Sequence, residues 1–444
     1  MHQIYLRHKI ICLFKKAHLA RRCCGVNKKK DGRGLLTAVR LQEEIMITIS
    51  SYLHRSVLRD IIRRWMYYDL DPSDVDTIAR LVHFNNVYVS RYLKIFSEKV
   101  FQALNGNSLY SKPAFLKSDL KDMIVANSPY RNSRIDALIH NYHADPGRFY
   151  RETPFQATLY FKRDNGAEDY IGSNRIKRVH RLAEKSARKI IDMIFDAIRK
   201  HADVLADERA RFLGIPRHQL LTPQEEMTAE FLRAEDRLLE DFKEKGKLHY
   251  AEDMVINDVA GMKVIIDNSE QDRLLAVLDL MGDCEIVENE KHSGKYNATN
   301  LIVRLKPPCE EILTQPLSEK IVEIMRVRGL NPEESNKAFV EFVKSGEETV
   351  CLEIIVSDYE EMLESEIGRC MHEDRITEQR LRQQYCGHLA KNIEYLMEYL
   401  FTFPSSTKTE LRELPIKLWN RYLPDYFEDV LKDLFRIPLS SVVE

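Results

Sequence analysis

The sequence predicts an α+β protein in which a mixed β-sheet is flanked by helices. Residues 256–303 contain three apolar, β-branched runs with one helical run between the first and the second, a pattern typical of strand–helix–strand–strand. A further strand-like run occupies residues 349–356. Segments with apolar residues at helical spacing precede and follow this region. Together these observations favour a sheet at the centre of the chain and helices around it.

The composition is that of a globular chain with a large core. The sequence has 444 residues, 44% hydrophobic and 31% charged, which is enough for two or three domains. It contains no uninterrupted apolar run long enough to cross a membrane and no signal-peptide pattern. The eight Cys residues are scattered, apart from one adjacent pair, and lack zinc spacing. We therefore expect a cytoplasmic protein with reduced thiols and no membrane contact.

Residues 1–45 form a basic N-terminal extension with eleven Lys and Arg side chains against Asp31, Glu43 and Glu44. One interpretation is a disordered basic arm that binds nucleic acid. The other is that the segment is not translated, because codons for residues 42–46 can contain AGGAGG shortly before an ATG, the form of a bacterial ribosome-binding site. We favour the second interpretation, in which Met46 is the first residue.

Residues 46–105 are expected to form a helical domain that resembles a helix-turn-helix. Its second helix, within residues 78–94, would be the recognition helix after a turn near His83, and it would expose Ser90, Arg91 and Lys94 to DNA. The alternative is a three-helix interaction domain without DNA contact, since this region is not strongly basic.

Residues 106–444 are expected to comprise a connector, a core domain with an insertion, and a C-terminal tail. Residues 106–154 would be a helical connector with short helices at 118–127 and 133–143. A β-hairpin should follow, because strand-like runs flank Asp164-Asn165-Gly166. Residues 186–250 would be a helical insertion within a core domain of residues 155–400. Residues 401–444 would be a C-terminal helical tail whose aromatic residues serve the core or a homo-oligomer contact.

Two carboxylates in the predicted strands are candidates for chemistry. Asp258 stands at the head of an apolar strand, where a buried carboxylate needs a partner such as a metal ion. Glu353 lies in the middle of the strand at 349–356 and faces the same side as Cys351 and Ile355. It points either into a cleft or to the solvated face of an edge strand.

A basic cluster precedes these acids. Arg175 and Lys177 are two residues apart and share one strand face, and Lys185 follows one to two turns into the next helix. Three cations that converge on one place suit a polyphosphate. The simpler alternative is a solvated basic start of a helix.

These residues, in this order, resemble the synthetase domain of the RelA/SpoT alarmone ((p)ppGpp) synthetases, of the nucleotidyltransferase superfamily. The family has Arg-x-Lys with a second Lys eight residues on, as at Arg175, Lys177 and Lys185. It has Asp-x-x-Gly-x-Arg on a strand, as at residues 258–263, where Lys263 replaces the Arg. The resemblance covers about residues 155–400.

Two later motifs continue the resemblance. Gly-Tyr-x-Ser-x-His of the family corresponds to residues 295–300, which keep Tyr296 but have Lys295 for the Gly and Asn300 for the His. Glu-x-Gln-x-Arg corresponds to the strand of Glu353, where the Gln and Arg are missing. A Glu-rich segment that contains His372 follows, as it often does in the family.

The resemblance implies transfer of pyrophosphate from ATP to the ribose 3′-hydroxyl of GDP or GTP, with Mg²⁺. Asp258 and Glu353 would hold the metal, and Glu353 would also activate the hydroxyl. The nucleotides would be bound by Arg175, Lys177, Lys185, Lys263, Tyr296 and Asn300, with Tyr296 stacked on the acceptor guanine. The alternative is a catalytically idle nucleotide-sensing domain joined to a DNA-binding or interaction domain.

The start of translation gives a first test. We expect protein purified from its own host to begin at Met46, because the preceding codons can encode a ribosome-binding site. Intact-mass spectrometry measures this directly. A species that begins at Met1 would contradict the expectation and would leave the basic-arm interpretation.

Overall fold

The computed structural model describes residues 47–106, 108–164, 166–245, 254–294, 297–381 and 385–435. The predictions for residues 1–45 and for Tyr296 lie outside these ranges. Within them, no helix is both long enough and apolar enough to cross a membrane.

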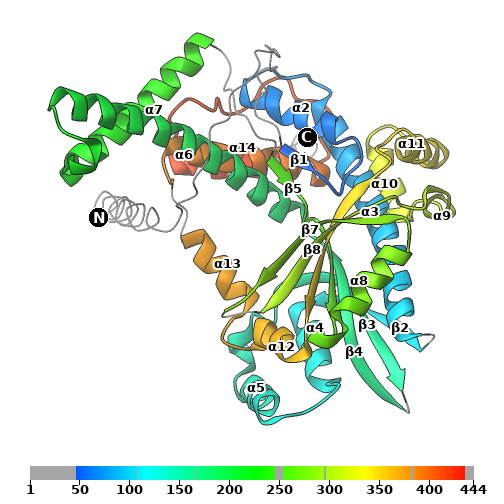
Figure 1. The fold of residues 1–444 in the computed structure, drawn as a ribbon. Helices are drawn as coiled ribbons and strands as arrows, with labels where there is room; N and C mark the ends of the chain where they lie inside the picture. Colours follow the sequence, from blue (N-terminus) through cyan, green and yellow to red (C-terminus); the bar gives the residue numbers. More distant parts are fainter. Residues whose placement is uncertain are drawn as a thin grey trace, which may run out of the picture.

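A mixed seven-strand sheet forms the centre of the molecule, in the order β2-β3-β4-β6-β9-β8-β7 (Figure 1). Only the central pair β6–β9 is parallel, and the other neighbours are antiparallel. The α+β class with a mixed sheet is therefore confirmed. The strands, in sheet order, are β2 (Leu109–Leu116), β3 (Pro154–Asp164), β4 (Ala167–Ile176), β6 (Ala260–Ile265), β9 (Val350–Ser357), β8 (Ala298–Leu305) and β7 (Cys284–His292).

The expected hairpin is present as β3 and β4. Gly166 in its turn has φ 87°, a left-handed value that glycine adopts without strain. Gly172 in β4 has φ 152°, and a Cβ there would lie 2.2 Å from the carbonyl oxygen of Lys263 and 2.6 Å from the ring of Phe101. This position therefore needs glycine, and it lets a helix approach the sheet closely.

The two faces of the sheet pack against different helices. Met262, Val264 and Ile354 are buried on one face, which α3 (Asp74–Asn105) covers. The other face carries a second core beneath α4 (Lys117–Ala126), α5 (Ser133–Ala144) and α12 (Tyr359–Ile367). Arg175, Gly261 and Glu353 lie on this second face and are partly exposed.

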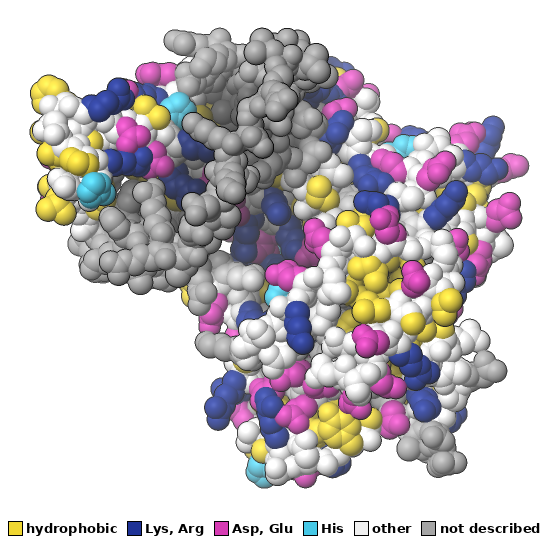
Figure 2. Space-filling view, viewed as in Figure 1, with side chains coloured by type: hydrophobic (Ala, Val, Ile, Leu, Met, Phe, Trp, Pro, Cys, Tyr) yellow, Lys and Arg dark blue, Asp and Glu magenta, His cyan; other side chains and the backbone are white. Residues whose placement is uncertain are grey.

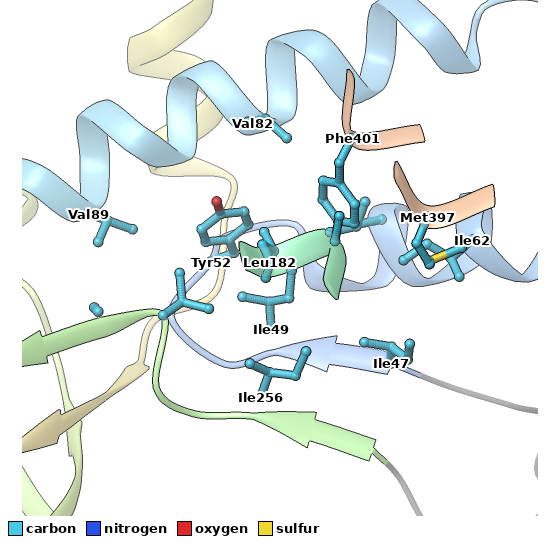
Figure 3. Close-up of a cluster of buried hydrophobic side chains, with 14 of the residues drawn as sticks. Ile47, Ile49, Tyr52, Ile62, Val82, Val89, Leu182, Ile256, Met397 and Phe401 are labelled. Carbon is cyan, nitrogen blue, oxygen red and sulfur yellow. The ribbon is translucent and has the colours of Figure 1, made fainter. Parts of the chain in front are cut away.

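Residues 47–105 share one core with the rest of the chain. Strand β1 (Ile47–Ile49) pairs in parallel with β5 (Met254–Ile256), and α2 (Arg55–Met66) follows. Figure 3 shows Ile49, Tyr52 and Ile256 packed with Leu182 and Phe401, which come from helices far along the chain. This shared packing joins the N-terminal helices to the body of the protein.

The predicted helix-turn-helix is wrong. Helix α3 runs without a break for 32 residues through His83, whose Nε2 contacts the carbonyl oxygen of Pro404 at 2.8 Å. The segment contains no Gly or Pro to end a helix, and its buried residues continue at helical spacing through the expected turn. Arg91 donates to the carbonyl oxygens of residues 312, 315 and 316 at 2.7–2.8 Å, while Ser90 and Lys94 are exposed. Arg91 therefore anchors a neighbouring segment.

The connector and the insertion follow the prediction with one addition. The connector has the two expected helices, α4 and α5, but it also supplies the edge strand β2. The insertion is a helical hairpin of α6 (Val179–Phe212) and α7 (Gln224–Lys245), with prolines at 216 and 223 between them. Its far end projects away from the sheet (Figure 1).

The remaining helices cover the edges of the molecule. Helix α14 packs along α6, and the segment after it touches α3. The tail described here contains one helix, α15, preceded by irregular chain from residue 406. The bounds are α8 (Gln271–Leu280), α9 (Cys309–Leu313), α10 (Glu319–Val327), α11 (Pro332–Lys344), α13 (His372–Leu381), α14 (His388–Thr402) and α15 (Pro424–Asp433).

The anchoring role of Arg91 can be tested by stability. Arg91→Ala removes a charged donor from three carbonyl oxygens, so it should lower the free energy of unfolding by about 1–3 kcal/mol. Lys94→Ala, one helical turn away and exposed, should change it by about 0.5 kcal/mol or less. Urea unfolding of both variants is the measurement. An unchanged stability of Arg91→Ala, together with loss of duplex DNA binding, would restore the recognition-helix interpretation.

Candidate active site

The polar face of the sheet aligns three of the expected positions. Arg175 on β4 pairs with Gly261 on β6, and Gly261 pairs with Glu353 on β9. Residues paired across neighbouring strands point to the same face, so Arg175 and Glu353 lie on either side of a position without a side chain. Gly261 thus leaves room for a ligand between a guanidinium and a carboxylate.

Asp258 meets both predicted lysines. It stands directly before β6, while Lys177 follows β4 and Lys185 lies in the second turn of α6. Lys177 Nζ is 2.5 Å from Asp258 Oδ2 and also donates to the Asp258 carbonyl oxygen at 2.5 Å. Lys185 Nζ donates to the same Oδ2. Two of the three cations expected to converge, Lys177 and Lys185, thus meet at the carboxylate of Asp258.

The pKa values of these groups depend on burial and on one another. Burial alone would raise the pKa of Asp258, but Lys177 and Lys185 outweigh it and lower this pKa to about 2. Burial lowers the pKa of Lys177 to about 8, against the opposing attraction of Asp258. Burial raises the pKa of Glu353, and the charge of Asp258 adds to the increase. Glu353 is therefore a stronger base than an ordinary glutamate.

Asp258 and Glu353 are the carboxylates of this site that could take part in binding a divalent cation. Asp258 Oδ1 is buried and has no hydrogen-bond partner among the described residues, so it offers a free lone pair toward the site. Glu353 Oε1 has a contact with Asn300 Nδ2 at 3.5 Å, at the limit of a hydrogen bond. In the part of the chain that the structure describes, no three His, Cys, Asp or Glu side chains form a ready metal site. Mg²⁺ would thus rely on two carboxylates together with phosphate oxygens and water.

Lys263 belongs to a second charged cluster beside this site. Its Nζ is 3.1 Å from Glu366 Oε1, and Lys117 Nζ is 2.7 Å from Glu366 Oε2. Lys117 also lies 3.1 Å from Glu373, which Lys121 approaches at 3.6 Å. Glu366, Lys117 and Lys121 are buried, so their charges depend on close partners within this cluster, which also contains Glu373 and Lys263. The expected nucleotide ligand Lys263 is held by a carboxylate here.

Sequence reasoning missed Lys117 and Lys121. They lie on one side of a short helix, four residues apart, in a segment that was expected to be only a connector. Burial of His372 lowers its pKa well below the usual range, and the nearby charges of Arg175 and Lys117 lower it further. His372 thus stands as a neutral imidazole near the first and second clusters.

The structure places the site residues predicted from the sequence in different parts of the molecule. Arg175, Lys177, Lys185, Asp258 and Glu353 come together, and Asn300 joins them through Glu353. Figure 2 shows Lys and Arg side chains gathered in a hollow near the start of α6. Lys263 lies in the second cluster, and Tyr296 is outside the described residues. Ser90, Arg91 and Lys94 belong to α3, which covers the opposite face of the sheet.

Comparison with known proteins finds no matching family model, no similar curated protein and no similar solved structure. The chemistry of the site must therefore be argued from its own residues.

The buried cluster around Glu366 should make stability depend on pH. Burial alone would raise the pKa of Glu366, but Lys117 and Lys263 lower it well below the usual range. A lowered folded-state pKa contributes stability above the unfolded value of about 4.3, and this contribution is lost as the pH falls toward the folded pKa. Glu366→Gln should therefore cost about 3–5 kcal/mol at neutral pH, because Lys263 loses its carboxylate and the buried Lys117 keeps only Glu373. The difference from the wild type should shrink below about pH 4.

Urea unfolding over a series of pH values measures this difference. Glu323→Gln is the control, because Glu323 forms an exposed pair with Arg326 one helical turn away and should contribute about 0.5 kcal/mol or less. A Glu366→Gln effect of the same size at every pH would show that the lowered pKa contributes nothing.

Proposed function

We propose that this chain transfers pyrophosphate from ATP to the ribose 3′-hydroxyl of GDP or GTP. The observation that carries the proposal is the meeting of two carboxylates and three cations on the polar side of β4, β6 and β9. A polyphosphate transfer requires cations for the phosphates, acids for a metal and a base for the hydroxyl. The resemblance to alarmone synthetases assigns the same positions to these tasks.

The cations of the site would bind the phosphates of ATP. Lys177 and Lys185 are now balanced by Asp258, so an incoming triphosphate would compete with Asp258 for both ammonium groups. That exchange would free the Asp258 carboxylate for Mg²⁺. Arg175, whose guanidinium lies over the ring of Phe155 at 5.8 Å, can hold phosphate oxygens in a fixed plane.

Glu353 would accept the proton of the 3′-hydroxyl, since its raised pKa makes it a suitable base. The resulting oxygen attacks the β-phosphorus of ATP, the bond between that phosphorus and the α,β-bridging oxygen breaks, and AMP leaves with the electron pair. When bound, Mg²⁺ would neutralise charge on the polyphosphate. Asn300, beside Glu353, would orient the carboxylate or the ribose.

Binding of the acceptor nucleotide is proposed from the resemblance to the alarmone synthetases. Tyr296 would stack on the guanine, and stacking of this kind contributes about 1–3 kcal/mol per base. The open space over Gly261 would admit the ribose between Arg175 and Glu353.

One observation favours a second candidate function. Asp258 pairs with both lysines and leaves a net positive charge, and this arrangement can hold a nucleotide without catalysing transfer. The chain would then be a nucleotide sensor, with the helices around the sheet as the responding part. The two candidates differ in whether Glu353 is needed for turnover.

Glu353→Gln tests the proposal. The substitution keeps the size of the side chain but removes the base, so it should lower the rate of transfer by a factor of about 10²–10⁴. The assay uses labelled ATP, Mg²⁺ and a panel of acceptor nucleotides, with the labelled product separated from ATP. Glu348→Gln is the matched control, because Glu348 lies just before β9 and its side chain is 82% exposed. It should leave the rate unchanged.

Binding separates enzyme from sensor. ATP should still bind to Glu353→Gln, because the phosphate-binding cations are unchanged. A wild-type chain that binds ATP but transfers pyrophosphate to no acceptor would reject the transferase and leave the sensor. If Glu353→Gln transfers as fast as the wild type, another group is the base.

A further inference from the structure

A second pocket lies on the other side of α12 from the buried charge cluster. Its volume is about 590 Å³, within the range of sites for small molecules, and it is bounded by α5, α12 and the short helix η1 (Pro146–Phe149). Glu364 lines this pocket, whereas Glu366 faces the buried cluster. Two residues along a helix correspond to a rotation of about 200°, so α12 separates the two places.

The rim of this pocket is positively charged. Among its lining residues, Arg134, Arg148 and Arg369 stand against one acid, Glu364. Arg134 is already engaged by Glu364 at 2.9 Å and by Glu360. Arg148 and Arg369 have no side-chain partner within the described ranges. Two guanidinium groups are therefore available to a ligand, and each can donate two parallel hydrogen bonds to an anion.

The base of the pocket is apolar. Leu138, Phe149 and Ile367 line it, and their side chains belong to the core under α5 and α12. Charged groups at the rim and an apolar base are the usual division of a small-molecule site, in which polar contacts orient the ligand and apolar surface contributes affinity. A bare inorganic ion would leave the apolar part unused.

The walls are held in place before any ligand arrives. Glu364 Oε2 accepts a hydrogen bond from the backbone N–H of Arg369 at 3.0 Å, and a Cβ at Gly368 would lie only 2.6 Å from the Cα of Glu364. The turn after α12 therefore needs glycine. On the opposite wall, Lys121 donates to the carbonyl oxygen of Phe149 at 2.6 Å. A pre-formed pocket avoids much of the ordering cost of binding.

We propose that this pocket binds a small molecule that has a phosphate group and an apolar body. Arg148 and Arg369 would hold the phosphate, because a phosphate dianion with three terminal oxygens suits two guanidinium groups better than a carboxylate with two oxygens. The apolar body would lie against Phe149 and Ile367. This site does not depend on the proposed transferase function, since α12 separates it from Asp258 and Glu353.

Isothermal titration calorimetry at low ionic strength tests the proposal, with phenyl phosphate as the probe. Phenyl phosphate should bind the wild type more tightly than benzoate, inorganic phosphate or benzyl alcohol, because only phenyl phosphate combines the dianion with the ring. The double variant R148Q/R369Q should weaken phenyl phosphate at least about tenfold, which corresponds to ~1.4 kcal/mol. Both side chains are exposed, so the variant should unfold at the temperature of the wild type.

Two further variants distinguish this pocket from other cationic places. Arg131→Gln is the matched control, because Arg131 is an exposed arginine near the start of α5 that pairs with Asp136, and it should not change the affinity. Arg175→Gln alters the candidate active site and should also leave the affinity unchanged. The proposal is overturned if Arg175→Gln abolishes binding while R148Q/R369Q retains it. It is equally overturned if benzyl alcohol binds as well as phenyl phosphate, or if the wild type binds no phenyl phosphate at millimolar concentration.

Discussion

The buried carboxylate of Glu366 connects the parts of this protein that carry its polar sites. It accepts from Lys117, at the start of α4, and from Lys263, on the central strand β6, and it belongs itself to α12. Removing three charges from water costs several kcal/mol for each ion, and only close pairing offsets that cost. The cluster therefore restricts the positions of α4, β6 and α12 relative to one another. Both the candidate active site and the second pocket border elements that this cluster holds.

The division of the sheet into two faces explains where polar chemistry can lie. The face under α3 is closed by apolar side chains and by Gly172, which allows Phe101 to approach the backbone. The other face is covered by α4, α5 and α12 only over part of its width. Arg175, Gly261 and Glu353 on this face are partly exposed. A carboxylate in the middle of a strand is tolerated at such a place because it is not sealed in the core.

In the first cluster, Lys177 and Lys185 share the single carboxylate of Asp258, so a net positive charge remains. The lowered pKa of Asp258 keeps it ionised at any ordinary pH. A ligand must then replace the contribution of Asp258 to both lysines. A polyphosphate with a metal ion can do this, because the phosphate takes the ammonium groups while the metal takes the carboxylate. A ligand that lacks either the negative phosphates or the metal ion would leave either the lysines or Asp258 unpaired. This requirement is a source of selectivity.

Local pattern alone predicted much of the fold and part of the site. Alternating and apolar runs located the strands, Gly166 marked the hairpin, and period two placed Glu353 on the same side as Cys351. Charge and spacing predicted that Arg175, Lys177 and Lys185 would converge, and the resemblance placed Asp258 in the same site. These features depend on neighbours within a few residues, which is the range over which backbone geometry acts.

Other features depended on partners distant in the sequence. The register that sets Gly261 between Arg175 and Glu353 arises only when three strands pair. Lys117 and Glu366 are 249 residues apart, and no local pattern can pair them. Arg91 was expected to contact DNA because a turn near His83 would place it in a recognition helix. Instead, α3 is continuous, and Arg91 donates to three carbonyl oxygens of a segment more than 200 residues away in the sequence. The sequence by itself determined where the strands and their charged residues lie along the chain. Only the tertiary structure decided which charges pair, because pairing depends on distances between segments that are far apart in the sequence.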